Sequence, residues 1–212
     1  MKKKKILNLY AGIGGNRKKW GPGNEITAVE MEPEIARIYR DNFPDDKIII
    51  GDAHQYLLDH YKEFDFIWSS PPCQSHSKMM KGTRHETVKY FDLNLYQEII
   101  LLQNFFKGKW LVENVRPYYK PLINPTAKIG RHLFWSNYGI LNCEIPKPPG
   151  DLINSSTIED GEKLKDWLGI HYDKVIYYKN NHDPCQILRN CVHPDLGLHI
   201  FNESKRTGLF CL

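Results

Sequence analysis

Residues 6–15 read Ile-Leu-Asn-Leu-Tyr-Ala-Gly-Ile-Gly-Gly, and this stretch decides the fold. Its first half is a short apolar run that is typical of a buried strand. Gly12, Gly14 and Gly15 follow at once, and glycine lets the backbone turn tightly and approach a ligand closely. In sheets of parallel strands, ligands bind at the carboxyl ends of the strands. The stretch therefore predicts the first strand of an α/β sheet, with a ligand site at its end.

Strand-like and helical segments alternate through the first half of the chain. Short apolar runs predict further strands over residues 26–30, 47–50, 64–69 and 110–115. Apolar residues spaced three or four apart predict helices over residues 33–43, 53–61 and 92–106. Strands that alternate with helices predict a doubly wound, mostly parallel sheet that carries helices on both faces.

Length and composition limit the function classes. The chain has 212 residues, which suits one domain with a small irregular lobe and is too short for two full domains. Its longest apolar stretch, residues 99–106, contains Gln103 and Asn104, whereas a membrane helix needs about 18 apolar residues in a row. An odd number of cysteines without dense spacing, and no secretory leader, favour a reducing compartment. We therefore expect a cytoplasmic protein that does not enter the membrane.

Two acidic residues follow the next two predicted strands. Glu30 ends the strand after the glycine loop, where a carboxylate can accept hydrogen bonds from a ribose. Asp52 follows the third strand, where it can bind an adenine amino group. A glycine loop and two acids on successive strand ends describe a site for an adenosine-type cofactor, although a glycine-rich turn after a strand is often only a turn.

Two further strand ends carry side chains suited to catalysis. Residues 70–77 read Ser-Pro-Pro-Cys-Gln-Ser-His-Ser, and the prolines stiffen the approach to Cys73, a candidate nucleophile. The fifth strand closes on Glu113, Asn114 and Val115. A glutamate at a strand end over a cleft can keep a raised pKa and act as a general acid. A buried inert cysteine and a solvated carboxylate are the plain alternatives.

Together these segments resemble the cytosine-5 DNA methyltransferases. The resemblance rests on the order of the glycine loop, the two acids, Pro-Cys-Gln at residues 72–74 and Glu-Asn-Val at residues 113–115. It covers residues 6–138 and resumes over residues 186–200. It implies the fold of the class I S-adenosylmethionine-dependent methyltransferases. It also implies S-adenosylmethionine as cofactor, S-adenosylhomocysteine as product and DNA as partner.

The resemblance assigns the cofactor residues one by one. Met31 would lie against the adenine ring, and Leu95 matches a weaker motif. Residues 189–194 read Arg-Asn-Cys-Val-His-Pro and resemble the last family motif, whose asparagine, here Asn190, packs against the cofactor. The implied cofactor site consists of Tyr10, Ala11, Gly12, Ile13, Gly14, Gly15, Glu30, Met31, Asp52, Ala53, Pro72, Leu95 and Asn190.

The family's chemistry implies roles for three further residues. The Cys73 thiolate would attack carbon 6 of a cytosine flipped out of the duplex, and Glu113 would stabilise the charge at ring nitrogen 3. The family's arginine motif is replaced by Ile-Gly-Arg-His-Leu-Phe-Trp at residues 129–135. Arg131 or His132 would then take the role of the arginine at the pyrimidine carbonyl, and we favour Arg131.

Charge is distributed unevenly among the parts that the resemblance defines. Residues 1–138 would form the catalytic core with a net charge of +6, and residues 184–212 a C-terminal helix that returns to it. Residues 139–183 would be a reduced target-recognition lobe with five lysines against eight acidic residues and no long periodic run. A lobe this short predicts short or loose specificity, or a helper protein. A basic run consists of Lys78, Lys81, Arg84 and Lys89. It would contact DNA phosphates, and the alternative is that it is only a solvated loop.

The sequence also allows other interpretations. The same chemistry on RNA is one alternative, disfavoured because the Cys-Phe-Thr motif of the tRNA-acting branch is missing; a non-catalytic nucleic-acid-binding relative is another. A zinc site is disfavoured, because five residues separate the two cysteines of the candidate set His182, Cys185, Cys191 and His193. The second Pro-Cys-Gln, residues 184–186, lacks the flanking motifs, so Cys185 is expected to be structural. A role in protecting a genome from restriction, or in modifying a viral genome, would suit the leading hypothesis.

Overall fold

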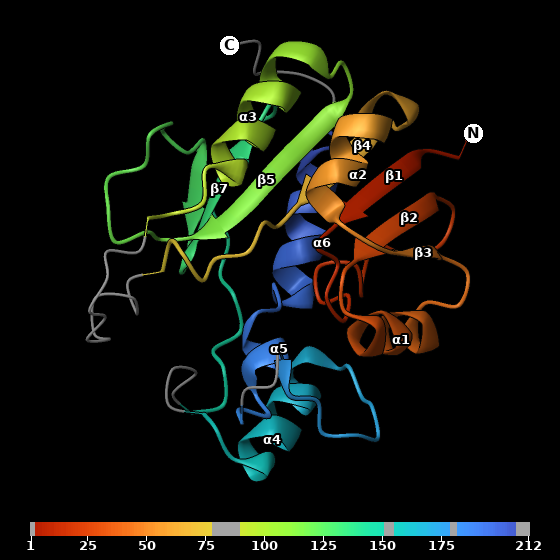
Figure 1. The fold of residues 1–212 in the computed structure, drawn as a ribbon, viewed down its shortest axis with the longest axis vertical. Helices are drawn as coiled ribbons and strands as arrows, with labels where there is room; N and C mark the ends of the chain where they lie inside the picture. Colours follow the sequence, from red (N-terminus) through yellow and green to blue (C-terminus); the bar gives the residue numbers. More distant parts are fainter. Residues whose placement is uncertain (1–2, 78–89, 151–154, 179–181, 207–212) are drawn as a thin grey trace.

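The computed structural model describes residues 3–77, 90–150, 155–178 and 182–206. Within these ranges the chain forms one sheet with the strand order β3-β2-β1-β4-β5-β7-β6 (Figure 1). The strands are β1 (Lys5–Leu9), β2 (Glu25–Glu30), β3 (Lys47–Ile50), β4 (Phe66–Ser69), β5 (Lys109–Val115), β6 (Ala127–Ile129) and β7 (His132–Ser136). The basic run noted at residues 78–89 lies outside the described residues.

The sheet is doubly wound, as the alternating pattern predicts. β1 pairs in parallel with β2 and β4, β2 with β3, and β4 with β5. β7 runs antiparallel to both β5 and β6. The chain moves outward from β1 to β3 and then returns to β4 on the other side of β1, so the order reverses between β1 and β4. Ligands of such sheets bind in the crevice at this switch point, beyond the carboxyl ends of the strands.

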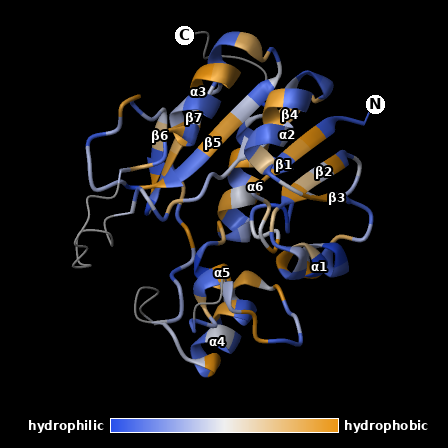
Figure 2. Cartoon of the chain, viewed as in Figure 1, coloured by the Kyte–Doolittle hydropathy of each residue, from blue (hydrophilic) through white to orange (hydrophobic). Residues whose placement is uncertain are grey.

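Helices cover both faces of the sheet. The helices of the described residues are α1 (Pro33–Asn42), α2 (Ala53–His60), α3 (Asn94–Phe105), α4 (Ile158–Leu168), α5 (Gln186–Arg189) and α6 (Pro194–Glu203), with a short 3-10 turn, η1 (Tyr61–Glu63). Leu7 and Leu9 of β1 pack in one core cluster with α2 and α3, whereas Ile6 packs in another with α6. Figure 2 shows hydrophobic residues along the central strands between these layers. No helix of the described ranges is long and apolar enough to span a membrane.

The structure adds a hairpin that the sequence pattern does not predict. β6 and β7 pair antiparallel, with Ile129 opposite His132, and Gly130 and Arg131 form the turn between them. Gly130 has a φ of 56°, in the left-handed region that favours glycine. β6 is only three residues long, which is too short for an alternating pattern to stand out. The hairpin places Arg131 and His132 beside the end of β5.

The sequence shows no long periodic run over residues 139–183, yet the structure places α4 within them. Thr157 accepts a hydrogen bond from the Asp160 N–H, and the Asp160 side chain bonds back to the Thr157 N–H, which forms a capping box. Gly169, with a φ of 61°, ends the helix. Leu164 and Leu168 of α4 pack against the α5 segment, α1 and the glycine loop. Figure 1 shows α4 and α5 together beyond the carboxyl edge of the sheet.

Candidate active site

A cavity of about 190 Å³ opens at the carboxyl ends of the parallel strands. Its walls come from the loops after β1, β2 and β4, the end of β5, the β6–β7 turn and the segment around α5. The cavity therefore occupies the switch point of the sheet. Of the residues predicted to form the site, those that line the cavity are Tyr10, Ala11, Gly12, Ile13, Gly15, Glu30, Met31, Ala53, Pro72, Cys73, Glu113, Arg131 and Asn190.

The glycine loop after β1 borders the cavity with bare backbone. Tyr10 and Gly12 adopt left-handed backbone, with φ angles of 54° and 55°. A Cβ atom added at Gly12 would meet nothing within 4 Å, so the loop leaves open space at this point. A Cβ atom at Gly15 would instead lie 2.6 Å from the carbonyl oxygen of Val192. Gly12 thus permits the turn, and Gly15 permits close packing against the segment after α5.

Glu30 presents a nearly buried carboxylate at the end of β2. Its Oε2 accepts the Gly12 N–H at 2.9 Å, and its Oε1 accepts the Glu32 N–H at 3.0 Å. A carboxylate has about four acceptor positions, so this one can still bind donors from a ligand. Burial raises the pKa of Glu30, although the backbone N–H groups oppose that increase. Met31 follows it with 52% of its surface exposed on the cavity wall.

Three residues of the predicted cofactor site lie outside the cavity lining. A Cβ atom on Gly14 would be 2.2 Å from the Phe43 ring, so this glycine serves the packing of the loop on the end of α1. The Asp52 side chain caps α2 and accepts the His54 N–H at 2.8 Å. Leu95 belongs to the first turn of α3 and is buried in the core.

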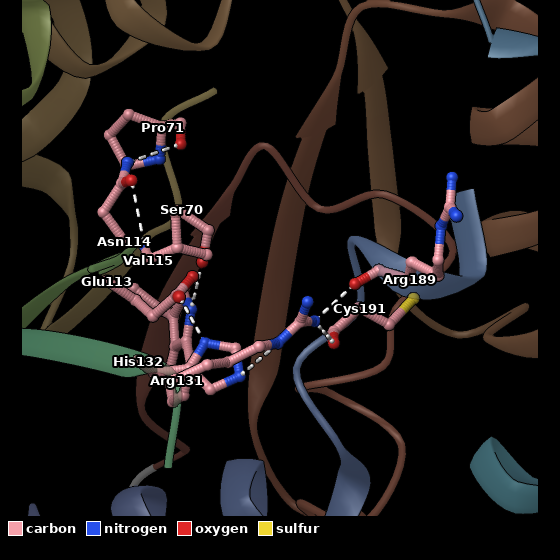
Figure 3. A network of polar contacts seen from close by, with 10 residues as sticks. Ser70, Pro71, Glu113, Asn114, Val115, Arg131, His132, Arg189 and Cys191 are labelled. Carbon is pink, nitrogen blue, oxygen red and sulfur yellow. Dashed lines mark hydrogen bonds and ion pairs between the residues drawn. The ribbon is translucent and has the colours of Figure 1, made fainter. Parts of the chain in front are cut away.

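Cys73 lines the cavity after the two prolines that follow β4. The Asn114 amide donates a hydrogen bond to the Pro71 carbonyl at 3.0 Å, which ties the proline loop to β5 (Figure 3). Burial and, to a lesser extent, the negative charge of Glu113 raise the pKa of the Cys73 thiol, the positive charge of Arg131 lowers it, and the net pKa is about 11. At neutral pH the thiol of the free chain is therefore protonated.

Glu113, His132 and Arg131 form a chain of polar contacts at the cavity wall (Figure 3). His132 Nδ1 lies 2.6 Å from Glu113 Oε1, and both side chains are buried. Arg131 Nε donates to His132 Nε2 at 3.3 Å. Because the guanidinium can only donate, His132 Nε2 is the acceptor and Nδ1 carries the proton toward Glu113. The histidine therefore fixes one oxygen of Glu113.

Arg131 also joins the hairpin to the segment after α5. Its Nη2 donates to the carbonyl oxygens of Arg189 and Cys191, the latter at 3.4 Å (Figure 3). Both Arg131 and His132 line the cavity, so the structure brings together the two residues that the sequence offered for the arginine role.

Some residues near the cavity were not identified from the sequence. Tyr178, which lies between α4 and α5 in the chain, and Ile187 of α5 line it, and no motif marks either residue. Glu98 of α3 is fully buried beneath the glycine loop and bonds to the Tyr10 hydroxyl. The signal that could have revealed Glu98 is its charge in the middle of an apolar helical stripe.

Comparison with known proteins identifies relatives for this arrangement. A family model described as C-5 cytosine-specific DNA methylase matches residues 4–128. The chain is 34% identical over 76 residues to a tRNA (cytosine(38)-C(5))-methyltransferase of Spodoptera frugiperda, covering 33% of this chain and 23% of the relative. It is 29% identical over 119 residues to the type II methyltransferase M1.HphI of Haemophilus parahaemolyticus, covering 51% of this chain and 32% of the relative. A solved structure of Spodoptera frugiperda DNMT2, carrying the mutations E260A/E261A/K263A, matches with 31% identity and a TM-score of 0.37, over 53% of this chain and 35% of that one.

The chain spans about a quarter to a third of the length of these curated relatives. Its sheet, with one strand antiparallel to its neighbours and helices on both faces, is consistent with the class I methyltransferase fold that the resemblance implied. The family model covers more than half of the chain and includes the glycine loop, Cys73 and Glu113. The chain therefore belongs to the C-5 cytosine-specific DNA methylase family.

Proposed function

We propose that the chain transfers a methyl group to carbon 5 of cytosine in DNA, through a covalent bond between Cys73 and carbon 6 of the base. The observation that carries this proposal is the shared cavity: Cys73, Glu113 and the glycine loop line the same space. A nucleophile, an acid and a cofactor loop within one cavity can act on one base.

S-adenosylmethionine is the methyl donor of this family, and the cavity fits it. The Glu30 carboxylate keeps acceptor capacity for ribose hydroxyls, and the exposed Met31 offers an apolar surface to an adenine ring. Gly12 leaves room along the backbone, while Ala53 and Asn190 complete the walls. Bound there, S-adenosylmethionine supplies an electrophilic methyl group. Asp52, used as the cap of α2, is assigned to hold the first turn of that helix beside the site.

Cys73 provides the nucleophile in the proposed mechanism. Carbon 5 of cytosine is a weak nucleophile, and addition of the Cys73 thiolate to carbon 6 turns the ring into an enamine-like species that can accept the methyl group at carbon 5. Loss of the carbon-5 proton then expels the thiolate. Because the free thiol has a pKa of about 11, it must lose its proton as the base binds. The positive charge of Arg131 favours that loss.

Glu113 and the two residues beside it stabilise the charge that thiolate addition creates. His132 holds Oε1 of Glu113, which leaves Oε2 to carry a proton and to donate it to ring nitrogen 3 of the pyrimidine. Arg131 is assigned to the pyrimidine carbonyl oxygen. The guanidinium has five N–H donors, and its Nε and Nη2 are already engaged, so Nη1 is the group available for this contact. Carbons 5 and 6 of a cytosine are enclosed in a duplex, so the base is expected to flip into the cavity.

RNA is the second candidate substrate, because one relative is named as a tRNA methyltransferase. DNA is preferred because the family model is that of a DNA methylase and another relative is named as a type II methyltransferase. That second name also supports a role in protecting DNA from restriction. A helper protein for target recognition remains part of the proposal.

Transfer of tritium-labelled methyl from S-adenosylmethionine to DNA or RNA tests the proposal. We expect label in DNA, none with Cys73→Ala, and unchanged S-adenosylhomocysteine binding in that variant. Cys143→Ala is the matched control, because Cys143 is a free cysteine outside the cavity lining. Full activity of Cys73→Ala would overturn the mechanism, and label in RNA alone would replace the substrate.

A further inference from the structure

Glu98 is a buried carboxylate that the proposed chemistry does not use. It is fully buried within α3. Its Oε1 accepts the Tyr10 hydroxyl at 2.7 Å and lies 2.9 Å from His54 Nδ1, and its Oε2 accepts the Ser69 hydroxyl at 2.5 Å. A carboxylate in such a place is costly to the fold unless its oxygens are hydrogen-bonded. The three donors satisfy that requirement.

The three donors come from three different strand ends. Tyr10 begins the glycine loop after β1, and His54 lies in the first turn of α2 after β3. Ser69 is the last residue of β4 and is fully buried outside the cavity lining, while its neighbour Ser70 lines the cavity. One carboxylate thus contacts the cofactor loop and the strand that leads to Cys73.

The backbone conformation of Tyr10 shows why the glycine loop needs the hydrogen bond to Glu98. Its φ of 54° lies in the left-handed region, which costs free energy for a residue with a side chain and persists only where the surroundings hold it. The hydrogen bond to Glu98 and packing against the core hold its side chain. The conformation of the glycine loop therefore depends on Glu98, which also binds Ser69 of β4.

We propose that Glu98 is a positioning residue that fixes the glycine loop relative to the loop after β4 that carries Cys73. The part of the cavity that holds the cofactor and the nucleophile are then preorganised together. The inference rests on the proposed function only in calling Cys73 the nucleophile. If the inference holds, a substitution at Ser69 changes the binding of S-adenosylhomocysteine. A substitution at Glu98 changes the reactivity of Cys73.

Two measurements test the inference without relying on methyl transfer. Calorimetry gives the dissociation constant of S-adenosylhomocysteine, and iodoacetamide labelling with peptide mass spectrometry gives the alkylation rate of Cys73. We expect Glu98→Gln to weaken S-adenosylhomocysteine binding about tenfold and to change the Cys73 alkylation rate, because a charged hydrogen-bond acceptor is lost. Ser69→Ala should weaken the same binding although Ser69 lies outside the cavity lining.

A control and a double variant separate positioning from general stability. Glu203→Gln removes another buried carboxylate, one that pairs with Arg206 on the α6 side, and should leave both readouts unchanged. The double variant Glu98→Gln with Ser69→Ala should bind no more weakly than Glu98→Gln alone, because both changes break one contact. Equal losses in the Glu203 control, or normal binding and labelling in Glu98→Gln and Ser69→Ala, would overturn the inference. If the unaltered chain binds S-adenosylhomocysteine but methylates nothing, the proposed function fails and this test still stands.

Discussion

At the scale of single residues, His132 decides how Glu113 is presented to a ligand. The 2.6 Å contact between His132 Nδ1 and Glu113 Oε1 is buried, and Arg131 Nε fixes the other ring nitrogen. A histidine held at both nitrogens has one tautomer and one orientation. Glu113 therefore meets a ligand in a set geometry.

His132→Gln is predicted to lower the rate of methyl transfer by about tenfold or more, because Glu113 loses the partner that orients it. Binding of S-adenosylhomocysteine should not change, since the contact lies on the Glu113 side of the cavity. Single-turnover rates and calorimetry measure the two effects. His199→Gln is the control, because His199 bonds the Leu141 carbonyl outside the cavity lining. A cofactor-binding loss equal to the rate loss would contradict this role.

His54 gives the Glu98 cluster a dependence on pH. The hydrogen bond to Glu98 raises the pKa of His54, the charges of Glu98 and Asp52 and the Gln97 side chain add to the increase, and burial opposes it. A raised pKa means that the protonated histidine stabilises the folded chain fully below its ordinary value of 6.5. That stabilisation is lost as the pH rises through the folded-state pKa.

His54→Gln should therefore cost more free energy of unfolding at pH 6 than at pH 8. Urea unfolding at the two pH values measures the difference. His60→Gln is the matched control, because His60 also meets a carboxylate, Glu63, but on the exposed surface. An equal cost of His54→Gln at both pH values would show that the imidazole charge does not matter.

At the scale of elements, the sequence predicted what short-range patterns determine. The strands and helices of the alternating half appear with shifts of up to two residues, because strands buried on both faces are continuous apolar runs. The β6–β7 hairpin and α4 were not predicted. β6 is too short to show a period, and α4 is marked mainly by its capping box.

The candidate site likewise has a part that the sequence predicts and a part that it does not. Cys73 and Glu113 could be expected near each other, because each follows or ends one of two neighbouring parallel strands. The contacts of Glu98, and the placement of Arg131 against the carbonyls of Arg189 and Cys191, could not be expected. They join segments far apart in the chain, and no local spacing encodes such contacts.

Gly15→Ala is predicted to lower the free energy of unfolding by about 2 kcal/mol, because overpacking against backbone cannot be relieved by a side-chain rotation. The added Cβ would lie 2.6 Å from the Val192 carbonyl oxygen and 2.9 Å from Cys191 Cβ. Gly51→Ala is the control, since nothing lies within 4 Å of a Cβ there. Chemical denaturation compares the two. A cost for Gly15→Ala no larger than for Gly51→Ala would show that the loop can move away from the segment after α5.

At the scale of the whole molecule, α4 packs against elements that border the cavity. Leu164 and Leu168 of α4 share a core cluster with Ile13 of the glycine loop and Ile35 of α1. The helix therefore packs behind Ile13 and Ile35, which line the cavity. Its segment, residues 139–183, is also acidic, with five lysines against eight acidic residues, whereas residues 1–138 carry +6. Contacts to phosphates are favoured by the basic part.

Residues 139–183 form a short segment with a net charge of −3, which does not favour contact with phosphates. Sequence is read by side chains that reach base edges in the grooves, and each good contact discriminates by about 1–3 kcal/mol. We therefore predict that these 212 residues, acting alone, methylate a short or loosely defined target. Bisulfite sequencing of plasmid DNA treated with the purified chain measures the target. The inactive Cys73→Ala variant, treated identically, sets the background. A long, strictly read target would show that residues 139–183 contact the bases directly despite the packing of α4.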